Sequence, residues 1–308
     1  MGRVAELGWR ATGRVMSVPR AQDVPAGRLV DLPGGHRTYV VDTGTPDGDD
    51  GTRPVLMLLH ALACTGLLTW YPTIARLRSR YRIITYDQRW HGQGPRPAQF
   101  RLEDCADDVA AVCDVLDLDR VVLGGYSMGS LVTQLAWHQH PDRVSGAILA
   151  ASTTRFTDEH RDPATLRAIS GRLARATARR QAAISAAVYA QGIDAAALIS
   201  PDEHNRWALA QLRTTPTSSI AGAAAVISTF DSTPWIGGMN VPAAVVVTAR
   251  DRLLPPDRQR RLAKSITGAT QYEVAAGHAS VVMQADRFVP AMQAAVASVA
   301  SRVSAAGR

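Results

Sequence analysis

Short apolar runs recur along the chain, and longer segments with helical spacing separate them. Apolar residues fill most positions of each run, which is typical of strands that are buried on both faces of a sheet. Helical spacing is clearest at 103–116 and 128–138. This alternation predicts an α/β fold, with a mostly parallel central sheet and helices on both of its faces. The apolar runs are 54–59, 81–86, 120–126, 144–151, 242–249 and 272–276.

The segment before the first buried run has a different pattern. Apolar and polar residues alternate at 27–33 and 36–43, and a Pro-Gly-Gly turn at 33–35 joins them, which predicts a β-hairpin. Residues 1–26 carry basic side chains but no continuous apolar stretch and no convincing cleavage site. We therefore expect an N-terminal tail and not a secretory signal. An amphipathic surface helix in this tail stays open.

One long interval breaks the alternation of strands and helices. Residues 153–238 are rich in Ala and Arg, have helical spacing and contain no clear buried strand. An insertion of this size after the strand at 144–151 predicts a helical cap over a site at the strand ends, where open α/β sheets bind ligands. We expect a core domain made of 27–152 and 239–308, with the cap between its two parts.

Composition sets limits on the class of protein. The chain has 308 residues, 46% hydrophobic and 20% charged, so it is long enough to bury a substantial core. No run of 18 apolar residues occurs, and we expect no transmembrane helix. The cysteines Cys64, Cys105 and Cys113 lack metal-ligand spacing, and their odd number fits reduced thiols in a cytoplasmic protein.

The net charge of +7 raises the question of an anionic partner. Nearly all the positive side chains are arginines scattered along the chain, and Lys264 is the one lysine. With the abundance of alanine, this indicates a bias of genome composition, so we expect no nucleic-acid partner. The densest arginine cluster lies at 167–180. It fits a solvated helix face, and a face that contacts an anion or a membrane surface stays open.

The strongest chemical signal is the sequence Gly-Tyr-Ser-Met-Gly at 125–129, between a predicted strand and a predicted helix. This G-x-S-x-G pattern in that setting predicts a sharp turn that exposes the hydroxyl of Ser127 as a nucleophile. The turn also aims a helix N-terminus at the same place, where positive potential favours negative charge. The amide of Met128 is therefore predicted to be one donor of an oxyanion hole.

A serine nucleophile needs a base, and the base needs an acid that orients it. Asp251 follows the buried run at 242–249, and His278 follows the last run within a Gly-His pair. The chain order of serine, acid and histidine is the one expected for a nucleophile at a strand-to-helix turn. We predict that His278 is the general base and that Asp251 stabilises its imidazolium form.

The second oxyanion donor is expected in the loop that follows the run at 54–59. The backbone amides of Ala61 and Leu62 are both suitably placed, and we favour Leu62. The imidazoles of His60 and His91 are expected to hold the strand-end loops by hydrogen bonds.

With these residues the chain resembles the α/β-hydrolase superfamily over about residues 27–300, and it is similar to actinobacterial single-domain hydrolases labelled esterase or lipase. Two positions depart from the pattern of the superfamily. Ala61 and Trp90 stand where glycine is customary, and Trp90 is expected either to pack under its loop, which we favour, or to project toward the site. The resemblance rests on His60-Ala61, on Asp87-Gln88-Arg89-Trp90-His91-Gly92, on the sequence at 125–129, on Asp251 with Pro255, and on Gly277-His278.

Serine in place of aspartate at the turn argues against the haloalkane dehalogenase and epoxide hydrolase branches of this superfamily. The predicted reaction is hydrolysis of carboxylic esters with apolar or lipid-like acyl groups through an acyl-enzyme on Ser127. Three alternatives stay open: acyl transfer to an alcohol or to peroxide, C–C bond hydrolysis, and a ligand receptor without catalysis. No zinc spacing, P-loop or dinucleotide fingerprint occurs, so we expect neither a metal nor a cofactor.

Overall fold

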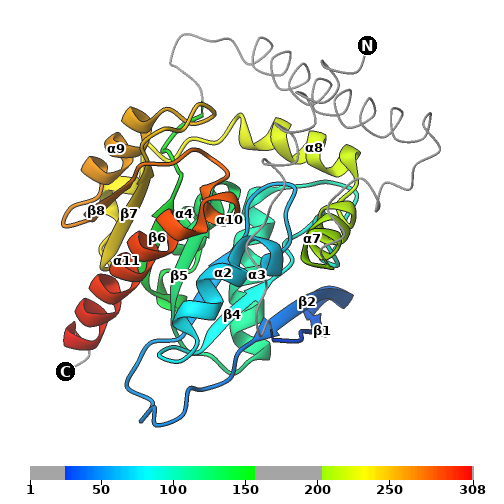
Figure 1. Ribbon diagram of the computed structural model, residues 1–308, viewed down its shortest axis with the longest axis horizontal. Helices are drawn as coiled ribbons and strands as arrows, with labels where there is room; N and C mark the ends of the chain where they lie inside the picture. The colour runs from blue at the N-terminus through cyan, green and yellow to red at the C-terminus, as the bar shows by residue number, and fades with distance from the viewer. Residues whose placement is uncertain (1–24, 157–202, 307–308) are drawn as a thin grey trace.

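A computed structural model of the chain describes residues 25–156 and 203–306. Nearly all of the predicted tail, the arginine cluster at 167–180 and a large part of the predicted cap lie outside these ranges. Eight strands form one sheet in the order β1-β2-β4-β3-β5-β6-β7-β8 (Figure 1). β2 runs antiparallel to β1 and β4, and all other neighbours are parallel. The strands are β1 (Arg28–Leu32), β2 (His36–Asp42), β3 (Leu56–Leu59), β4 (Ile83–Tyr86), β5 (Val121–Tyr126), β6 (Val144–Ala150), β7 (Ala243–Thr248) and β8 (Thr270–Val274).

The predicted mostly parallel α/β fold is confirmed, since each predicted apolar run contains or overlaps a strand. The hairpin also forms as expected, with β1 and β2 joined at Pro33–Gly35. Gly34 and Gly35 have φ angles of 80° and 75° there. This left-handed conformation costs glycine little, because glycine has no Cβ.

Two layers of helices cover the two faces of the sheet (Figure 1). Alternate residues of β3 point to opposite faces, so Leu56 and Leu58 belong to the core cluster that α2 and α11 cover, and Met57 and Leu59 belong to the cluster that α3, α4 and α9 cover. Within the described ranges, no helix is long and apolar enough to cross a membrane. The helices are α2 (Gly66–Leu77), α3 (Leu102–Val115), α4 (Met128–Gln139), α7 (Glu203–Arg213), α8 (Thr217–Ile227), α9 (Pro256–Ser265), α10 (Ser280–Met283) and α11 (Ala285–Ala306).

The described part of the insertion between β6 and β7 contains the helices α7 and α8. Its two ends meet at a short antiparallel bridge between Arg155 and Asp231. The guanidinium of Arg155 also donates to the carboxylate of Asp231, with 2.9 Å between Nε and Oδ2. Next to this bridge, the amide of Ser232 donates to the carbonyl of Thr154 at 2.8 Å. These contacts join the two ends of the insertion next to the sheet. That the insertion is a separate cap domain stays a prediction.

Candidate active site

Ser127 lies at the turn from β5 to α4 in a strained backbone conformation. Its φ of 52° and ψ of −114° are disfavoured for a residue with a side chain. The flanking glycines permit this turn because backbone approaches both of them closely. A Cβ atom at Gly125 would overlap the carbonyl of Gly129, and one at Gly129 would overlap the carbonyl of Leu59. The G-x-S-x-G spacing is therefore a steric requirement of this turn.

Hydrogen bonds to the neighbouring strand hold the strained turn in place. The amide of Ser127 donates to the carbonyl of Ala150 on β6 at 3.0 Å. The buried hydroxyl of Ser130 lies 2.6 Å from the carbonyl oxygen of Gly125 and 2.9 Å from that of Ala150. Strain of this kind costs about 1–3 kcal/mol and persists only where the surroundings over-determine the conformation. The role of Ser130 is not apparent from the sequence motif.

The structure brings the three predicted side chains Ser127, His278 and Asp251 together. His278 Nε2 lies 2.9 Å from Ser127 Oγ, and His278 Nδ1 lies 2.6 Å from Asp251 Oδ2. Because the carboxylate accepts a hydrogen bond from the N–H at Nδ1, the neutral imidazole leaves Nε2 free to accept the serine proton. The histidine side chain is 21% exposed and the carboxyl group is 0% exposed. This arrangement can activate Ser127 as a nucleophile.

The carboxylate of Asp251 is held from several sides. Oδ1 accepts hydrogen bonds from the amides of Leu253 and Leu254, each at 2.9 Å. Oδ2 accepts from the hydroxyl of Thr248 at 2.8 Å as well as from His278. Burial raises the pKa of this carboxyl, but these hydrogen bonds and the charge of the imidazolium outweigh it, so the pKa lies below its ordinary value. The group is therefore ionised at neutral pH.

The residue before the serine holds the histidine loop. The hydroxyl of Tyr126 donates to the carbonyl of His278 at 2.8 Å and lies 3.2 Å from Ser280 Oγ. Tyr126 is buried, and its ring packs edge-on against Phe288 with 5.3 Å between the ring centroids. Burial raises the pKa of this phenol, so its proton stays in place for donation. Only tertiary structure reveals this contact, since 152 residues separate the two partners.

Two backbone amides are available for an oxyanion hole. Met128 is the first residue of α4, where amides have no partner within the helix. The close packing of Gly129 on the carbonyls of Leu59 and His60 brings the loop after β3 beside this turn. In the described part of the chain, the amides of Met128 and Leu62 donate no hydrogen bond, whereas the amide of Ala61 donates to Thr69 Oγ1 at 3.4 Å. This difference favours Leu62 over Ala61 as the second donor.

The two histidines of the strand-end loops are buried and neutral. His60 Nε2 accepts from the amide of Gln88 at 2.8 Å, and Nδ1 donates to the carbonyl of Ala61 at 2.8 Å. Burial lowers the pKa of His60 well below its ordinary value and that of His91 to about 4. The rings lie 5.1 Å apart, and His91 Nδ1 donates to the carbonyl of Arg89. These bonds join the loops that follow β3 and β4.

Trp90 packs between its own loop and the helical insertion. Its indole Nε1 donates to the carbonyl of Pro97 at 2.7 Å, and its ring lies 5.3 Å from that of Phe100. The other side of the ring is so close to Gly222 on α8 that a Cβ there would lie 2.5 Å from a ring carbon. Trp90 has a φ of 66°, which explains why glycine is customary at this position. Ala61 has no positive φ, so its methyl group brings no such strain.

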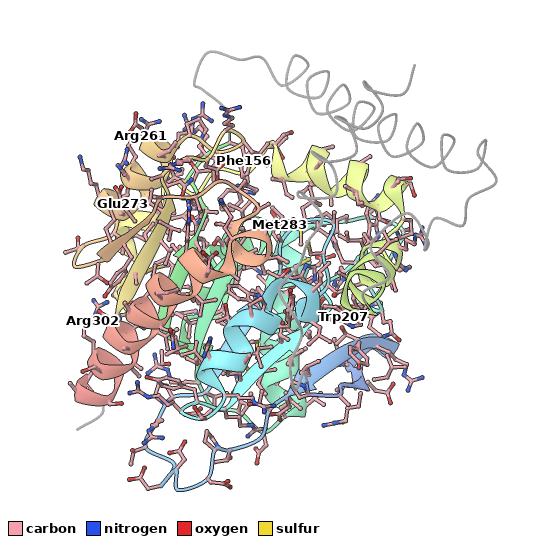
Figure 2. All side chains as sticks on the ribbon, viewed as in Figure 1. Phe156, Trp207, Arg261, Glu273, Met283 and Arg302 are labelled. Carbon is pink, nitrogen blue, oxygen red and sulfur yellow. The ribbon has the colours of Figure 1, made fainter. Side chains whose placement is uncertain are left out.

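The helical insertion is bonded to the strand-end loops of the core. Thr65 Oγ1 donates to Gln211 Oε1 on α7 at 2.7 Å, and the amide of Gly92 donates to Thr215 Oγ1 at 3.1 Å. Trp207 on α7 and Met283 on α10, both labelled in Figure 2, are half-buried side chains that pack against the core. The insertion therefore lies beside the loops that carry the site.

Comparisons with known proteins identify the family and the fold. The sequence model described as alpha/beta hydrolase fold matches residues 54–284. The chain is 24% identical over 246 residues to 3-oxoadipate enol-lactonase 1 of Acinetobacter baylyi, a match that covers 75% of this chain and 84% of that protein. The crystal structure of the enol-lactonase from Burkholderia xenovorans has a TM-score of 0.68 at 24% identity, over 88% of this chain and all of that one. A thermophilic esterase from Thermogutta terrifontis has a TM-score of 0.68 at 22% identity, over 89% of this chain and 99% of that one.

Proposed function

This chain belongs to the α/β-hydrolase family, and we propose that it is a serine hydrolase that cleaves carboxylic esters through an acyl-enzyme on Ser127. The observation that carries the proposal is the chain of two hydrogen bonds from Ser127 through His278 to Asp251. A buried ionised carboxylate, an oriented imidazole and a serine hydroxyl at a strained turn are the parts that acyl transfer needs.

In the proposed reaction, Ser127 Oγ attacks the ester carbonyl while His278 Nε2 takes its proton. The imidazolium that forms is stabilised by the carboxylate of Asp251. Negative charge that develops on the carbonyl oxygen is stabilised by the amides of Met128 and Leu62. His278 then protonates the leaving alcohol, and water activated by the same imidazole releases the acid and restores Ser127.

The acyl group is proposed to be apolar. Two apolar side chains support this proposal. Trp207 on the insertion and Met283 on α10 are half-buried and pack against the core. α8 consists mostly of alanine, isoleucine and valine. A lactone is a cyclic ester and uses the same chemistry, and the enol-lactonase relatives make lactones the second substrate class to test.

The test is hydrolysis of p-nitrophenyl esters with a series of acyl lengths, and of simple lactones, by the wild-type protein and by Ser127→Ala. We expect an optimum at one acyl length and loss of the activity in the variant. Added alcohol or peroxide would divert product if the protein is an acyltransferase or perhydrolase. A folded wild-type protein that is inactive on every ester and lactone would overturn the proposal and favour C–C hydrolysis or a receptor.

We propose a cytoplasmic location for the protein, and the state of its thiols supports this. Cys64, Cys105 and Cys113 are all free. Burial raises the pKa of Cys105 well above its ordinary value and the pKa of Cys113 to about 11, so both thiols stay protonated and unreactive. Fractionation of the source cells with an antibody against the protein tests the location.

A further inference from the structure

Two buried polar residues that the sequence motifs do not include, Thr248 and Gln259, form a network behind Asp251. We propose that Thr248 and Gln259 are positioning residues, which hold the Asp251 carboxylate with Oδ2 toward the imidazole of His278. The proposal rests on the proposed function, because it assigns these residues a part in tuning the same base. Both side chains are 0% exposed, although each carries groups that need hydrogen-bond partners.

The backbone determines the orientation of the Gln259 amide. Its Oε1 accepts from the amide of Thr248 at 2.9 Å, so the carbonyl end of the side chain faces β7. Its Nε2 donates to the carbonyl of Leu254 at 2.8 Å, in the loop that carries Asp251. Gln259 therefore joins the last residue of β7 to the loop of the acid from its place on α9. A flipped amide would lose both bonds.

This orientation in turn determines the direction of the Thr248 hydroxyl. Gln259 Nε2 lies 2.9 Å from Thr248 Oγ1 and donates to it, so the hydroxyl acts as an acceptor on that side. Its own proton then goes to Asp251 Oδ2 at 2.8 Å, which is closer than Gln259 Oε1 at 3.2 Å and carries a negative charge. Oδ2 therefore has two close donors, the threonine hydroxyl and the imidazole of His278, and Gln259 Nε2 is a third and more distant donor at 3.4 Å.

The shared oxygen links the network to the strength of the base. A hydroxyl that donates to Oδ2 takes up part of its negative charge, so less of that charge stabilises the imidazolium of His278. The same bond prevents the carboxylate from rotating away from Nδ1. Loss of the hydroxyl is expected to leave Asp251 less well placed and also to make the imidazolium more stable at a given pH.

Among the residues that the structure describes, few other titratable groups face Asp251. Besides His278, the phenol of Tyr126 interacts with it electrostatically from β5. The arginines beside it in the chain, Arg250 and Arg252, are exposed to solvent. On α9 the charged neighbours of Gln259 have other partners, since Arg258 donates to the carbonyl of Phe156 and Arg260 pairs with Asp257 and Glu273. The charge and the orientation of the Asp251 carboxylate therefore depend directly on the hydrogen bonds of the Thr248–Gln259 network.

The test compares Thr248→Val, which keeps the shape and loses the hydroxyl, with Thr248→Ser, which keeps the hydroxyl. We expect Thr248→Val to lower kcat by about tenfold to a hundredfold, as small misplacements in catalytic sites do. The acidic limb of its kcat/KM profile against pH is expected to move to higher pH by about half a unit. This is less than the pKa shift of about one unit or more that a direct hydrogen bond to a charged group causes. Thr248→Ser should retain both the kcat of the wild type and the position of its acidic limb.

Gln259→Met is the second variant. We expect it to move the acidic limb in the same direction by a smaller amount, because the Thr248 hydroxyl loses the donor that orients it. Thr85→Val is the matched control, since its buried hydroxyl donates to the carbonyl of Leu58 and its strand β4 lies four strands from β7, which leads into the loop of Asp251. A purely structural role for Thr248 would lower the melting temperature and leave the acidic limb in place, and that result would overturn the proposal.

An NMR titration of the His278 ring in the wild type and in Thr248→Val needs no substrate. A higher midpoint in the variant supports the positioning role even if no ester is hydrolysed, in which case only the proposed function has failed. Equal midpoints in the two proteins, with ester activity present, would overturn the positioning role and leave the proposed function standing.

Discussion

The hydroxyl of Tyr126 donates a hydrogen bond of 2.8 Å to the backbone carbonyl of His278. The residue that precedes the candidate nucleophile in the chain thus holds the loop of the candidate base. β5 ends at Tyr126, so a rigid central strand positions both partners of the proton transfer. In this arrangement His278 Nε2 lies 2.9 Å from Ser127 Oγ.

Tyr126→Phe is expected to lower kcat/KM for ester hydrolysis by about three- to tenfold, the equivalent of one neutral hydrogen bond. The ring remains to pack against Phe288, so the fold should persist. Steady-state kinetics on the best p-nitrophenyl ester measures the effect. Tyr39→Phe is the control, because its hydroxyl accepts only from the amide of Gly27 in the described chain, far along the sheet. Equal kinetics for wild type and Tyr126→Phe would show that the loop is held without this bond.

Ser127→Gly is expected to abolish activity and to stabilise the protein by about 1 kcal/mol, because glycine adopts a positive φ without strain. Urea unfolding followed by circular dichroism measures the stability. Ser127→Ala provides the comparison, since alanine removes the hydroxyl and keeps the strain. If the glycine variant were no more stable than the alanine variant, the strain at this turn would be negligible.

Stability is expected to fall as the pH is lowered from about 6.5 toward 4, because the folded protein keeps His91 neutral with a pKa of about 4. The unfolded chain binds a proton near pH 6.5, so the stabilising contribution is fully present above that pH. It amounts to at most about 3 kcal/mol for a shift of this size. Melting temperatures between pH 7.5 and pH 4.5 measure the loss.

His91→Asn is the matched variant for this pH experiment, because an asparagine amide can donate to the carbonyl of Arg89 and does not titrate. Its melting temperature should fall less between pH 7.5 and pH 4.5. Burial raises the pKa of Asp87 to about 6, and this acts in the opposite direction, with stability lost as the pH rises through 6. Asp87 is present in both proteins, so their difference isolates the histidine. Parallel pH curves would contradict the prediction.

Gly222→Ala is expected to destabilise the wild-type protein by about 1–3 kcal/mol, because the new methyl group overlaps the ring of Trp90. Without that ring, the same change should stabilise α8 by up to about 1 kcal/mol, the usual preference of helices for alanine over glycine. A double-mutant cycle with Trp90→Gly, measured by thermal unfolding, tests the direction of the stability change in both backgrounds. If Gly222→Ala had the same effect in both backgrounds, Trp90 and α8 would not be in contact.

The hydrophobic pattern by itself determined the strands, because burial on both faces of a sheet requires apolar residues at consecutive positions. Helices were harder to recognise. α3 and α4 were predicted, but α2, α9 and α11 were not, and Pro72 and Pro290 lie inside two of these three. Strand ends also differ from the predictions by one or two residues, because hydrogen bonding and not hydropathy determines where a ladder stops.

The order of Ser127, Asp251 and His278, each after a strand, was enough to identify three side chains that the structure brings within hydrogen-bond distance. Local sequence carries this information because parallel strands end at the same edge of a sheet. Only the tertiary structure decided what supports them, namely Tyr126 on the loop of His278 and Gln259 behind Asp251. Such contacts join distant parts of the chain and depend on the direction of single side chains, which no periodic pattern records.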